Sequence, residues 1–195
     1  MSTPFIPIRF QERHNKMSKI LVTGGAGFIG SHIVDRLVEM GHAVMVVDNL
    51  ATGHRANVNP AARFYEMDVR DPEFARLIMV ERPEVINHHA AQTRVRTSTE
   101  QPKYDAQVNV LGLINLLTAA AEAGARKVIF ASSGGTVYGA CRRLPITEDE
   151  PLMPKSLWDQ QGIQRALFAL LCQPGRALYG AALRQYLWPA RHCIQ

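Results

Sequence analysis

The feature that most constrains the fold is a cluster of glycines that follows a short apolar run near the N-terminus. Residues 20–22 are apolar, and Gly24, Gly27 and Gly30 then recur at every third position. This order predicts a strand, a tight turn and the first turn of a helix. Gly24 permits the turn, Gly27 lets a pyrophosphate approach the backbone because it has no Cβ, and Gly30 lets the helix pack against the strand. The free N–H groups at the start of that helix favour an anionic ligand.

The residues after the glycines supply the other parts of a dinucleotide site. The predicted helix ends at Gly41, and a second apolar strand at 43–47 leads into Asp48, 24 residues after Gly24. A carboxylate near this offset of about 20 residues hydrogen-bonds the adenosine ribose. It accepts from a 2′-hydroxyl and repels a 2′-phosphate, so the sequence favours NAD over NADP. The apolar face of the helix is predicted to consist of Ile29, Ile33, Val34, Leu37 and Val38.

Strand and helix patterns alternate beyond this point. Further strands are predicted at 63–67, 84–88 and 127–131, and further helices at 72–82 and 102–123. Asp71 is placed to cap the first of these helices with Pro72 at its first position, and Gly124 is placed to end the second. This alternation predicts an α/β fold, a Rossmann-like doubly wound parallel sheet.

The fourth predicted strand ends in two histidines and two small residues. Ala90 and Ala91 lie at the carboxyl edge, where ligands bind in open α/β sheets. His88 and His89 are adjacent on a strand and therefore point to opposite faces, so they cannot share a metal ion. We expect one to be packed and the other to lie near the ligand, and we predict no metal site.

The long helix predicted at 102–123 has an apolar face with one amide inside it. Asn109 is that amide, and its residue type alone predicts a buried side chain with satisfied hydrogen bonds. The inward-facing residues are predicted to be Val108, Leu111, Leu113, Leu116 and Leu117.

The basic charge of the chain is not gathered on one surface. The formal net charge is +5, of which residues 1–17 carry +2 and residues 157–195 carry +3, leaving the stretch between them neutral. This distribution argues against a nucleic-acid partner. No apolar run is long enough to span a bilayer, and no secretory signal pattern is present. The three cysteines have no paired spacing, which predicts a reducing, cytoplasmic setting without disulfides or a zinc site: Cys141, Cys172 and Cys193.

Taken together, the motifs resemble the extended short-chain dehydrogenase/reductase family, specifically its UDP-glucose 4-epimerase-like group of NAD-dependent epimerases and dehydratases. The matching segments occur in order and at family-like spacing, at 23–30, 48–50, 68–71, 88–92, 109–112, 132–139 and 145–148. The resemblance covers residues 17 to about 156. It implies NAD as cofactor, a nucleotide sugar as substrate of the parent enzyme, and a homodimer in the parent family that uses the long helix.

The resemblance also assigns roles to individual positions. The pyrophosphate would be contacted by Gly24, Gly27, Phe28 and Ile29, beside Gly30. The adenosine ribose would be held by Asp48 and Asn49, and the adenine by Asp68 and Val69. The pyrophosphate and nicotinamide ribose would lie beside His89, Ala90 and Ala91, with Asn109 in the same neighbourhood. The catalytic serine that bonds the substrate hydroxyl would be Ser133 or its neighbour Ser132.

One essential motif of this family is missing. The family uses a Tyr-x-x-x-Lys pair, in which the tyrosine takes the proton and the lysine lowers the tyrosine pKa. Trp158 and Gly162 stand at the corresponding positions, and no lysine follows Lys155. A DNA sequence that encodes residues 157–162 can also encode Pro-Tyr-Gly-Ile-Ser-Lys when it is read in the neighbouring frame. This second reading contains the missing Tyr-x-x-x-Lys motif, so we hypothesise a frameshift near Ser156. The rival hypothesis is a divergent native C-terminus.

These observations predict a domain organisation and an activity. Residues 1–17 are interpreted as a disordered extension, 18–156 as the NAD-binding domain, and 157–195 as an aberrant or divergent tail. The sheet would then be incomplete on its C-terminal side, without a substrate domain. We expect weak cofactor binding and no turnover. The alternatives are a non-catalytic NAD-binding or scaffold module, and a related dehydratase or decarboxylase; the lack of an Asp-Glu pair before Val137 argues against a dehydratase.

Overall fold

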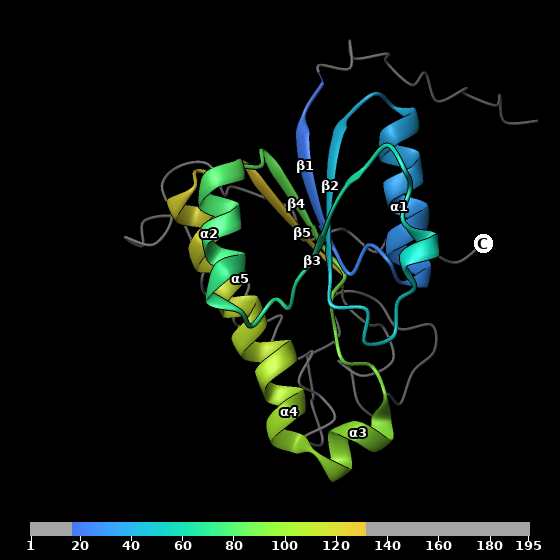
Figure 1. Cartoon of the computed structure of the whole chain (residues 1–195). Helices are drawn as coiled ribbons and strands as arrows, with labels where there is room; N and C mark the ends of the chain where they lie inside the picture. The colour runs from blue at the N-terminus through green and yellow to red at the C-terminus, as the bar shows by residue number, and fades with distance from the viewer. Residues whose placement is uncertain (1–16, 132–195) are drawn as a thin grey trace, which may run out of the picture.

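The computed structural model describes residues 17–131, which form a parallel sheet covered by helices. The strand order is β3-β2-β1-β4-β5, and every neighbouring pair is parallel. The strands are β1 (Lys19–Thr23), β2 (Ala43–Asp48), β3 (Arg63–Glu66), β4 (Val85–His88) and β5 (Lys127–Phe130). The chain builds one side of the sheet through β3 and then returns to β4 beside β1 (Figure 1). The predicted doubly wound parallel sheet is confirmed, and its switch point lies between β1 and β4.

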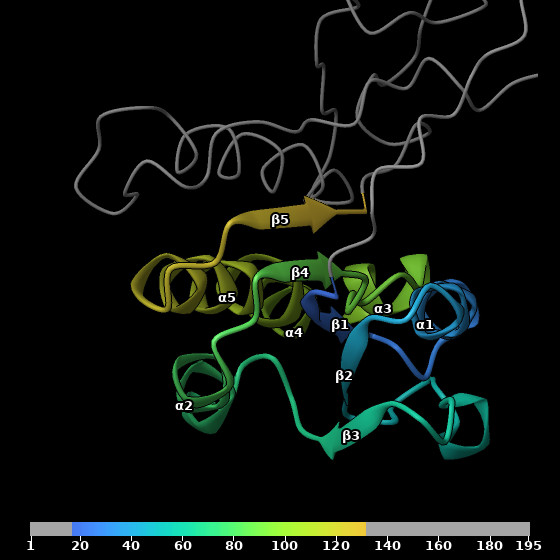
Figure 2. The same cartoon turned by 90° about the horizontal axis from the view of Figure 1, so that it is seen from above.

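Helices cover both faces of the sheet. The helical segments are α1 (Phe28–Glu39), η1 (Arg55–Asn57), α2 (Pro72–Glu81), α3 (Val95–Glu100), α4 (Pro102–Ala106), η2 (Gln107–Leu111) and α5 (Gly112–Glu122). Seen from above, α2 and α5 lie on one side of the sheet and α1 lies on the other (Figure 2). The last three segments follow one another without a break, and η2 is a π-helical turn within them.

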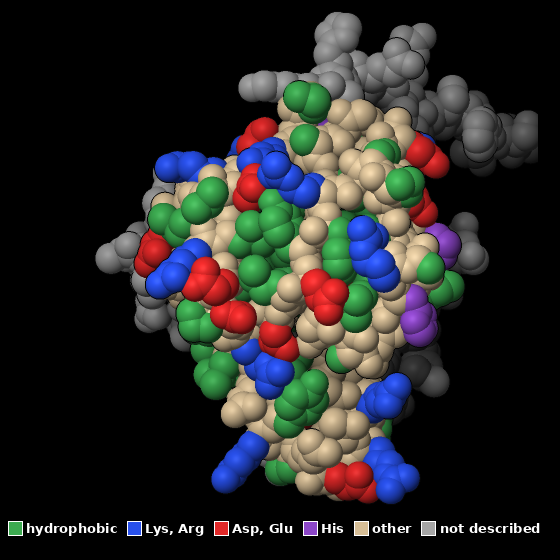
Figure 3. Space-filling model, in the orientation of Figure 1, with side chains coloured by type: hydrophobic (Ala, Val, Ile, Leu, Met, Phe, Trp, Pro, Cys, Tyr) green, Lys and Arg blue, Asp and Glu red, His purple; other side chains and the backbone are tan. Residues whose placement is uncertain are grey.

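The sheet separates two hydrophobic cores because strand side chains alternate between its faces. On one face, Leu21 of β1 packs with Phe74 of α2 and Leu117 of α5. On the other, Ile20 and Val22 of the same strand join a cluster that contains Val34 of α1. Figure 3 shows hydrophobic side chains at the surface of the face that it presents. Tyr65, Met67 and Leu77 of β3, the loop after it and α2 are partly buried against the first of these cores.

The predicted helix boundaries are confirmed by their local geometry. The Asp71 carboxylate accepts a hydrogen bond of 2.9 Å from the backbone N–H of Glu73, and Pro72 opens α2. Gly41, with φ 79°, follows α1, and Gly124, with φ 74°, follows α5. Glycine adopts this left-handed conformation without the strain that a Cβ introduces, which is why it ends helices so often.

Two predicted core positions are wrong. Leu111 is 57% exposed and Ile29 is 61% exposed, whereas Val108, Leu113, Leu116 and Leu117 are buried as predicted. The prediction for Leu111 assumed a regular 3.6-residue period, but the π-helical turn η2 adds residues to the turn and shifts its phase. Ile29 lies in the first turn of α1, on a side of the helix that is open to solvent.

The sequence did not predict the two short helices α3 and η1, which bury no residue and therefore carry no apolar period. Several other expectations lie outside the described residues. These are the disordered extension up to residue 16, the serines Ser132 and Ser133, and the tail at 157–195.

Candidate functional site

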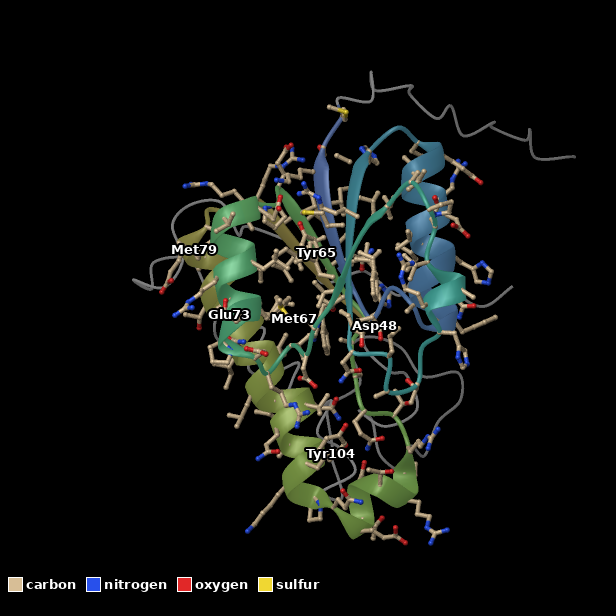
Figure 4. The ribbon with its side chains drawn as sticks, in the orientation of Figure 1. Asp48, Tyr65, Met67, Glu73, Met79 and Tyr104 are labelled. Carbon is tan, nitrogen blue, oxygen red and sulfur yellow. The ribbon has the colours of Figure 1, made fainter. Side chains whose placement is uncertain are left out.

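A cleft with a volume of about 570 Å³ opens at the carboxyl ends of the strands. It lies at the switch point of the sheet, where open α/β folds bind ligands. Figure 4 shows Asp48 at the end of β2 and Tyr104 on α4, both of which line the cleft. With the exception of Asn109, the predicted cofactor residues all line it: Gly24, Gly27, Phe28, Ile29, Gly30, Asp48, Asn49, Asp68, Val69, His89, Ala90 and Ala91.

The glycine turn forms the floor of this cleft. Gly24 has φ 69°, and a Cβ added to it would lie 2.6 Å from the backbone nitrogen of Ala90. The turn after β1 therefore touches the loop after β4, a contact that any side chain would prevent. A Cβ on Gly30 would collide with the carbonyl of Gly24, so this glycine lets α1 start directly against the turn.

The N-terminus of α1 offers an anion site to the cleft. No side chain caps this helix, and its first turn contains no acidic residue. Phe28 and Ile29 are 80% and 61% exposed, and both line the cleft together with Gly27. Backbone N–H groups at a helix N-terminus attract anions through the helix dipole and direct hydrogen bonds. This end of α1 can therefore bind a phosphate group while its two apolar side chains flank the ligand.

Asp48 joins the end of β2 to the glycine turn. The residue is 8% exposed; Oδ2 accepts a 3.0 Å hydrogen bond from the backbone N–H of Ala26, and Oδ1 accepts a 2.8 Å bond from that of Leu50. These bonds fix the carboxylate beside the phosphate site. Each carboxylate oxygen can accept more than one hydrogen bond, so capacity for ribose hydroxyls remains.

Asn49 and Asp68 are linked to each other at the ends of β2 and β3. The amide nitrogen of Asn49 donates a 2.8 Å hydrogen bond to Asp68, and the guanidinium of Arg70 binds both carboxylate oxygens of Asp68 at 2.8 Å. The hydrogen bond from Arg70 lowers the pKa of Asp68 to about 2 against a smaller opposing effect of burial. The Arg70 guanidinium also lies 5.0 Å from the ring centre of Tyr104, which connects this corner to α4.

The two histidines at the end of β4 and directly after it have different environments, as expected. The His88 side chain is fully buried, its Nδ1 lies 2.7 Å from the hydroxyl oxygen of Thr23, and its ring stacks on Phe130. Burial, with a smaller contribution from the neighbouring His89, lowers the pKa of His88 to about 3. Burial also lowers the pKa of His89, whose Nε2 lies 2.8 Å from the side-chain oxygen of Asn87. Both imidazoles are therefore neutral at pH 7. Among residues 17–131, no three histidine, cysteine, aspartate or glutamate side chains are grouped so that they could hold a metal ion.

Asn109 lies behind the wall of the cleft rather than in it. Its side chain is 6% exposed in the π-helical turn η2, and it contacts the loop after β4. Its Oδ1 accepts from the backbone N–H of Gln92 at 2.9 Å, while its Nδ2 donates to the carbonyl of Gln92 and to Asp105, both at 3.0 Å. The satisfied buried amide predicted from the residue type alone is confirmed.

The sequence profile of the NAD dependent epimerase/dehydratase family matches residues 20–182. The chain belongs to this family. It is 50% identical over 137 residues to a putative UDP-glucose 4-epimerase of Methanocaldococcus jannaschii, covering 70% of this chain and 45% of that protein. It is 45% identical over 143 residues to the UDP-glucose 4-epimerase of Mycolicibacterium smegmatis, covering 71% of this chain and 46% of that protein.

Solved structures of family members have the same fold. The UDP-glucose 4-epimerase of Thermus thermophilus, in complex with NAD, superposes with a TM-score of 0.73 at 43% identity and covers 77% of this chain and 50% of that one. The enzyme from Brucella ovis, also in complex with NAD, gives a TM-score of 0.74 at 36% identity and covers 80% of this chain and 48% of that one. The chain spans about half the length of these relatives.

Sequence reasoning missed the part of the family cleft that is built by loops and by α3 and α4. The missed residues include Thr52, Met67, Thr93, Arg94, Thr97, Tyr104 and Val108. They carry no shared motif, and only their place after the strand ends could have indicated them.

Among the helices described in residues 17–131, none has the length and apolar character that a membrane span requires.

Proposed function

We propose that this chain is the NAD-binding domain of a UDP-glucose 4-epimerase-like protein, and that the described cleft holds NAD. The observation that carries the proposal is the placement of Asp48. Its carboxylate is 3.0 Å from the backbone nitrogen of Ala26 in the glycine turn, so the phosphate site and the ribose acceptor form one unit. The relatives that were solved with NAD support the choice of dinucleotide.

The residues of the cleft fit the parts of NAD. The pyrophosphate fits the uncapped N-terminus of α1 beside Gly27, where a side chain would narrow the approach. The adenosine ribose fits Asp48, and the adenine fits between Asp68 and Val69. The nicotinamide half is left for the wall formed by His89–Ala91 and Phe130. When bound, NAD supplies the hydride acceptor for oxidation of a sugar hydroxyl.

The same geometry supports a preference for NAD over NADP. The Asp48 carboxylate is buried and held by two backbone N–H groups, so it cannot turn away from a ligand. A 2′-phosphate placed there would meet a fixed negative charge. We therefore expect NADP to bind at least about tenfold more weakly than NAD, which corresponds to about 1.4 kcal/mol.

Turnover is not part of the proposal for this chain. These 195 residues contain no Tyr-x-x-x-Lys sequence, and the indole of Trp158 cannot accept the proton that a tyrosinate takes in the family. Ser132 and Ser133 are proposed as the family serine that bonds the sugar hydroxyl. A nucleotide sugar as the parent substrate, a homodimer through the long helix and a cytoplasmic setting belong to the same proposal. A relative from Thermotoga maritima that was solved with UDP-glucose supports the substrate class.

The test combines calorimetry with an activity assay on the full chain. Titration with NAD is expected to give a weak Kd of about 0.1–1 mM, with NADP weaker still, and UDP-galactose is expected to be turned over at background level. The Asp48→Asn variant serves as a control for site occupancy and should lose the preference for NAD. Absence of NAD binding at millimolar concentration would refute the proposal for the cleft, and robust epimerisation would refute the proposed loss of turnover.

A non-catalytic NAD-binding or scaffold module is the second candidate. It is favoured by the two hydrophobic cores of residues 17–131, which pack on both faces of the sheet. Both candidates predict NAD binding, so the coding DNA around Ser156 distinguishes them. Codons that exclude the Tyr-x-x-x-Lys reading frame would favour a native module, and codons that encode it in the neighbouring frame would favour the frameshift.

A further inference from the structure

Two asparagines on the long helix hold loops that form walls of the cleft. Asn109 lies in η2 and Asn115 lies in α5, six residues later. Residues six apart do not share a face of a helix, which has 3.6 residues per turn, so the two amides reach different parts of the molecule. Asn109 contacts the loop after β4, and Asn115 contacts the loop after β3. Figure 1 shows α5 beside α2 on one face of the sheet, with α4 extending beyond the strands.

The Asn109 side chain forms hydrogen bonds with both backbone polar groups of Gln92, in the loop after β4. The N–H of Gln92 donates to Asn109 Oδ1 at 2.9 Å, and the carbonyl of Gln92 accepts from Asn109 Nδ2 at 3.0 Å. Gln92 directly follows Ala90 and Ala91, which line the cleft. Since both hydrogen-bonding groups of one residue are fixed, this wall cannot move toward or away from the ligand without breaking them.

A buried carboxylate keeps the Asn109 amide in this orientation. Asp105 is 2% exposed, and its Oδ1 accepts from Asn109 Nδ2 at 3.0 Å, from Gln92 Nε2 at 2.7 Å and from the Ser98 hydroxyl at 2.9 Å. An acceptor at this position requires the NH₂ group of Asn109 to face it, which leaves the amide oxygen for the Gln92 N–H. The network therefore couples the wall of the cleft to α3 as well as to the long helix.

Asn115 makes the corresponding contact on the adenine side. Its Nδ2 donates to the carbonyl of Val69 at 2.8 Å and to that of Asp71 at 3.2 Å. Val69 lines the cleft next to Asp68. One turn before Asn115, a Cβ added to Gly112 would lie 2.8 Å from a methyl carbon of Val69, so this glycine lets the loop approach the helix. These contacts give the segment 109–112, recognised in the sequence only by resemblance, a physical role.

We propose that Asn109 and Asn115 are positioning residues for the two halves of the dinucleotide. Asn109 fixes the wall against the nicotinamide half, and Asn115 fixes the wall against the adenosine half. This inference rests on the proposed binding of NAD for its ligand, but not for the loop contacts themselves. The two roles predict different effects on binding. Loss of the Asn109 side chain should affect the nicotinamide half of the ligand, and loss of the Asn115 side chain the adenosine half, whereas a general loss of stability would affect both halves alike.

The experiment compares NAD with AMP, which carries only the adenosine half, by ligand-observed NMR on the full chain. Asn109→Ala is expected to weaken NAD about tenfold and AMP less than about twofold, the size expected from losing one or two hydrogen bonds. Asn115→Ala is expected to weaken both ligands about tenfold by the same reasoning. Asn59→Ala is the matched control, because Asn59 bonds Asp35 at 2.8 Å and does not line the cleft.

Hydrogen exchange provides a measurement that does not depend on NAD. Asn109→Ala should speed exchange in residues 89–94, Asn115→Ala should speed it in residues 68–72, and Asn59→Ala should change neither segment. If the wild-type chain fails to bind NAD but shows these exchange effects, the positioning role stands and the proposed function fails. If the folded Asn109→Ala variant shows neither faster exchange nor a changed ratio of NAD to AMP affinity, the inference is overturned.

A milder pair of variants decides the case if Asn109→Ala does not fold. Ser98→Ala removes a donor to Asp105 and an acceptor for Gln92 Nε2, together with a weak bond to the carbonyl of Arg94. Thr99→Ala on the same short helix removes a bond to the carbonyl of Val95. Ser98→Ala is expected to weaken NAD about two- to threefold with AMP unchanged, and Thr99→Ala is expected to leave both affinities at the wild-type level. Equal effects of the two variants would contradict the inference.

Discussion

The two sides of the cleft are held by different kinds of hydrogen bond. On the side of the glycine turn, the backbone itself carries the geometry: Gly24 N–H donates to the carbonyl of Val47 at 2.8 Å, and Asp48 accepts from two backbone N–H groups. On the side of the β4 loop, Gln92 is held by the side chains of Asn109 and Asp105. The side formed by the glycine turn depends mainly on backbone geometry. That geometry requires particular residues, such as glycine, at fixed positions, so the sequence reveals it. A side built from side chains depends on a network that its own local sequence does not reveal.

The largest effect is expected where the two sides touch. Gly24→Ala combines a left-handed backbone with a Cβ 2.6 Å from the nitrogen of Ala90, whereas Gly41→Ala has the same left-handed backbone with no described atom within 4 Å. We expect Gly24→Ala to lower the free energy of unfolding by about 3 kcal/mol or more and to abolish NAD binding, and Gly41→Ala to cost about 1 kcal/mol. Urea unfolding measures both. Equal losses would show that the contact between the two sides contributes nothing.

The next largest effect is the pH dependence of stability that His88 causes. His88 lies where β1 and β4 are adjacent, between the two sides of the cleft. His88 contacts Thr23 across these strands, and burial lowers its pKa to about 3 from 6.5. Between these values the unfolded chain binds a proton that the folded chain excludes. The stability present above pH 6.5 is therefore lost as the pH falls toward 3, with a slope of about 1.4 kcal/mol per pH unit for this group.

Replacing His88 by phenylalanine tests that slope. His88→Phe keeps an aromatic ring against Phe130 but removes both the titration and the bond to Thr23. We expect the variant to be less stable than the wild type at pH 8, by about 1–3 kcal/mol, and the difference to shrink and then reverse as the pH falls to 4. Denaturant curves at several pH values give the measurement, with the exposed His32→Ala as control. Parallel pH profiles of wild type and variant would contradict the assignment.

A smaller effect is expected in the side-chain network itself. Asp105→Leu leaves the donors of Gln92, Ser98 and Asn109 without their shared acceptor. We expect a loss of about 2 kcal/mol in stability, because the buried Asn109 amide loses one of its two acceptors, while Gln92 and Ser98 keep hydrogen bonds to the carbonyl of Arg94. Asp105→Asn keeps an acceptor oxygen at the same place and should retain most of the stability. Thermal and urea unfolding compare the two, and a loss as large for Asp105→Asn as for Asp105→Leu would mean that shape alone, not the acceptor, matters.

The same contrast explains what the sequence could predict. The glycine spacing, the apolar strands and the position of Asp48 indicated the parallel sheet and one side of the cleft, because each depends on backbone geometry or local periodicity. The π-helical turn, the exposure of Leu111 and the contact of Asn109 with Gln92 were not predicted from the local sequence. They depend on how a helix meets a loop 17 positions away in the chain, which residue type and period do not encode.

The smallest effect is expected for the ion pair between Arg70 and Asp68. This pair is a contact between side chains on the side of the cleft that is held mostly by backbone hydrogen bonds. Arg70 binds both oxygens of Asp68 at 2.8 Å and lowers the pKa of that carboxyl to about 2 from 3.8. The stability from this pair is therefore present above pH 3.8 and lost as the pH falls toward 2. Because the pair is partly open to solvent, Arg70→Gln should cost only about 1 kcal/mol at pH 7 and nothing near pH 2.

An NMR titration of the Asp68 carboxyl checks the cause directly. In Arg70→Gln its pKa should rise toward the ordinary value, while Arg76→Gln, which removes an exposed ion pair with Glu73, should leave it unchanged. If Arg70→Gln cost as much stability as Asp105→Leu, the adenine side would depend on its side chains as strongly as the β4 loop does. A small loss together with a shifted pKa would instead show that Arg70 orients the Asp68 carboxylate, while the backbone bonds of Asp48 and Gly24 keep that side in place.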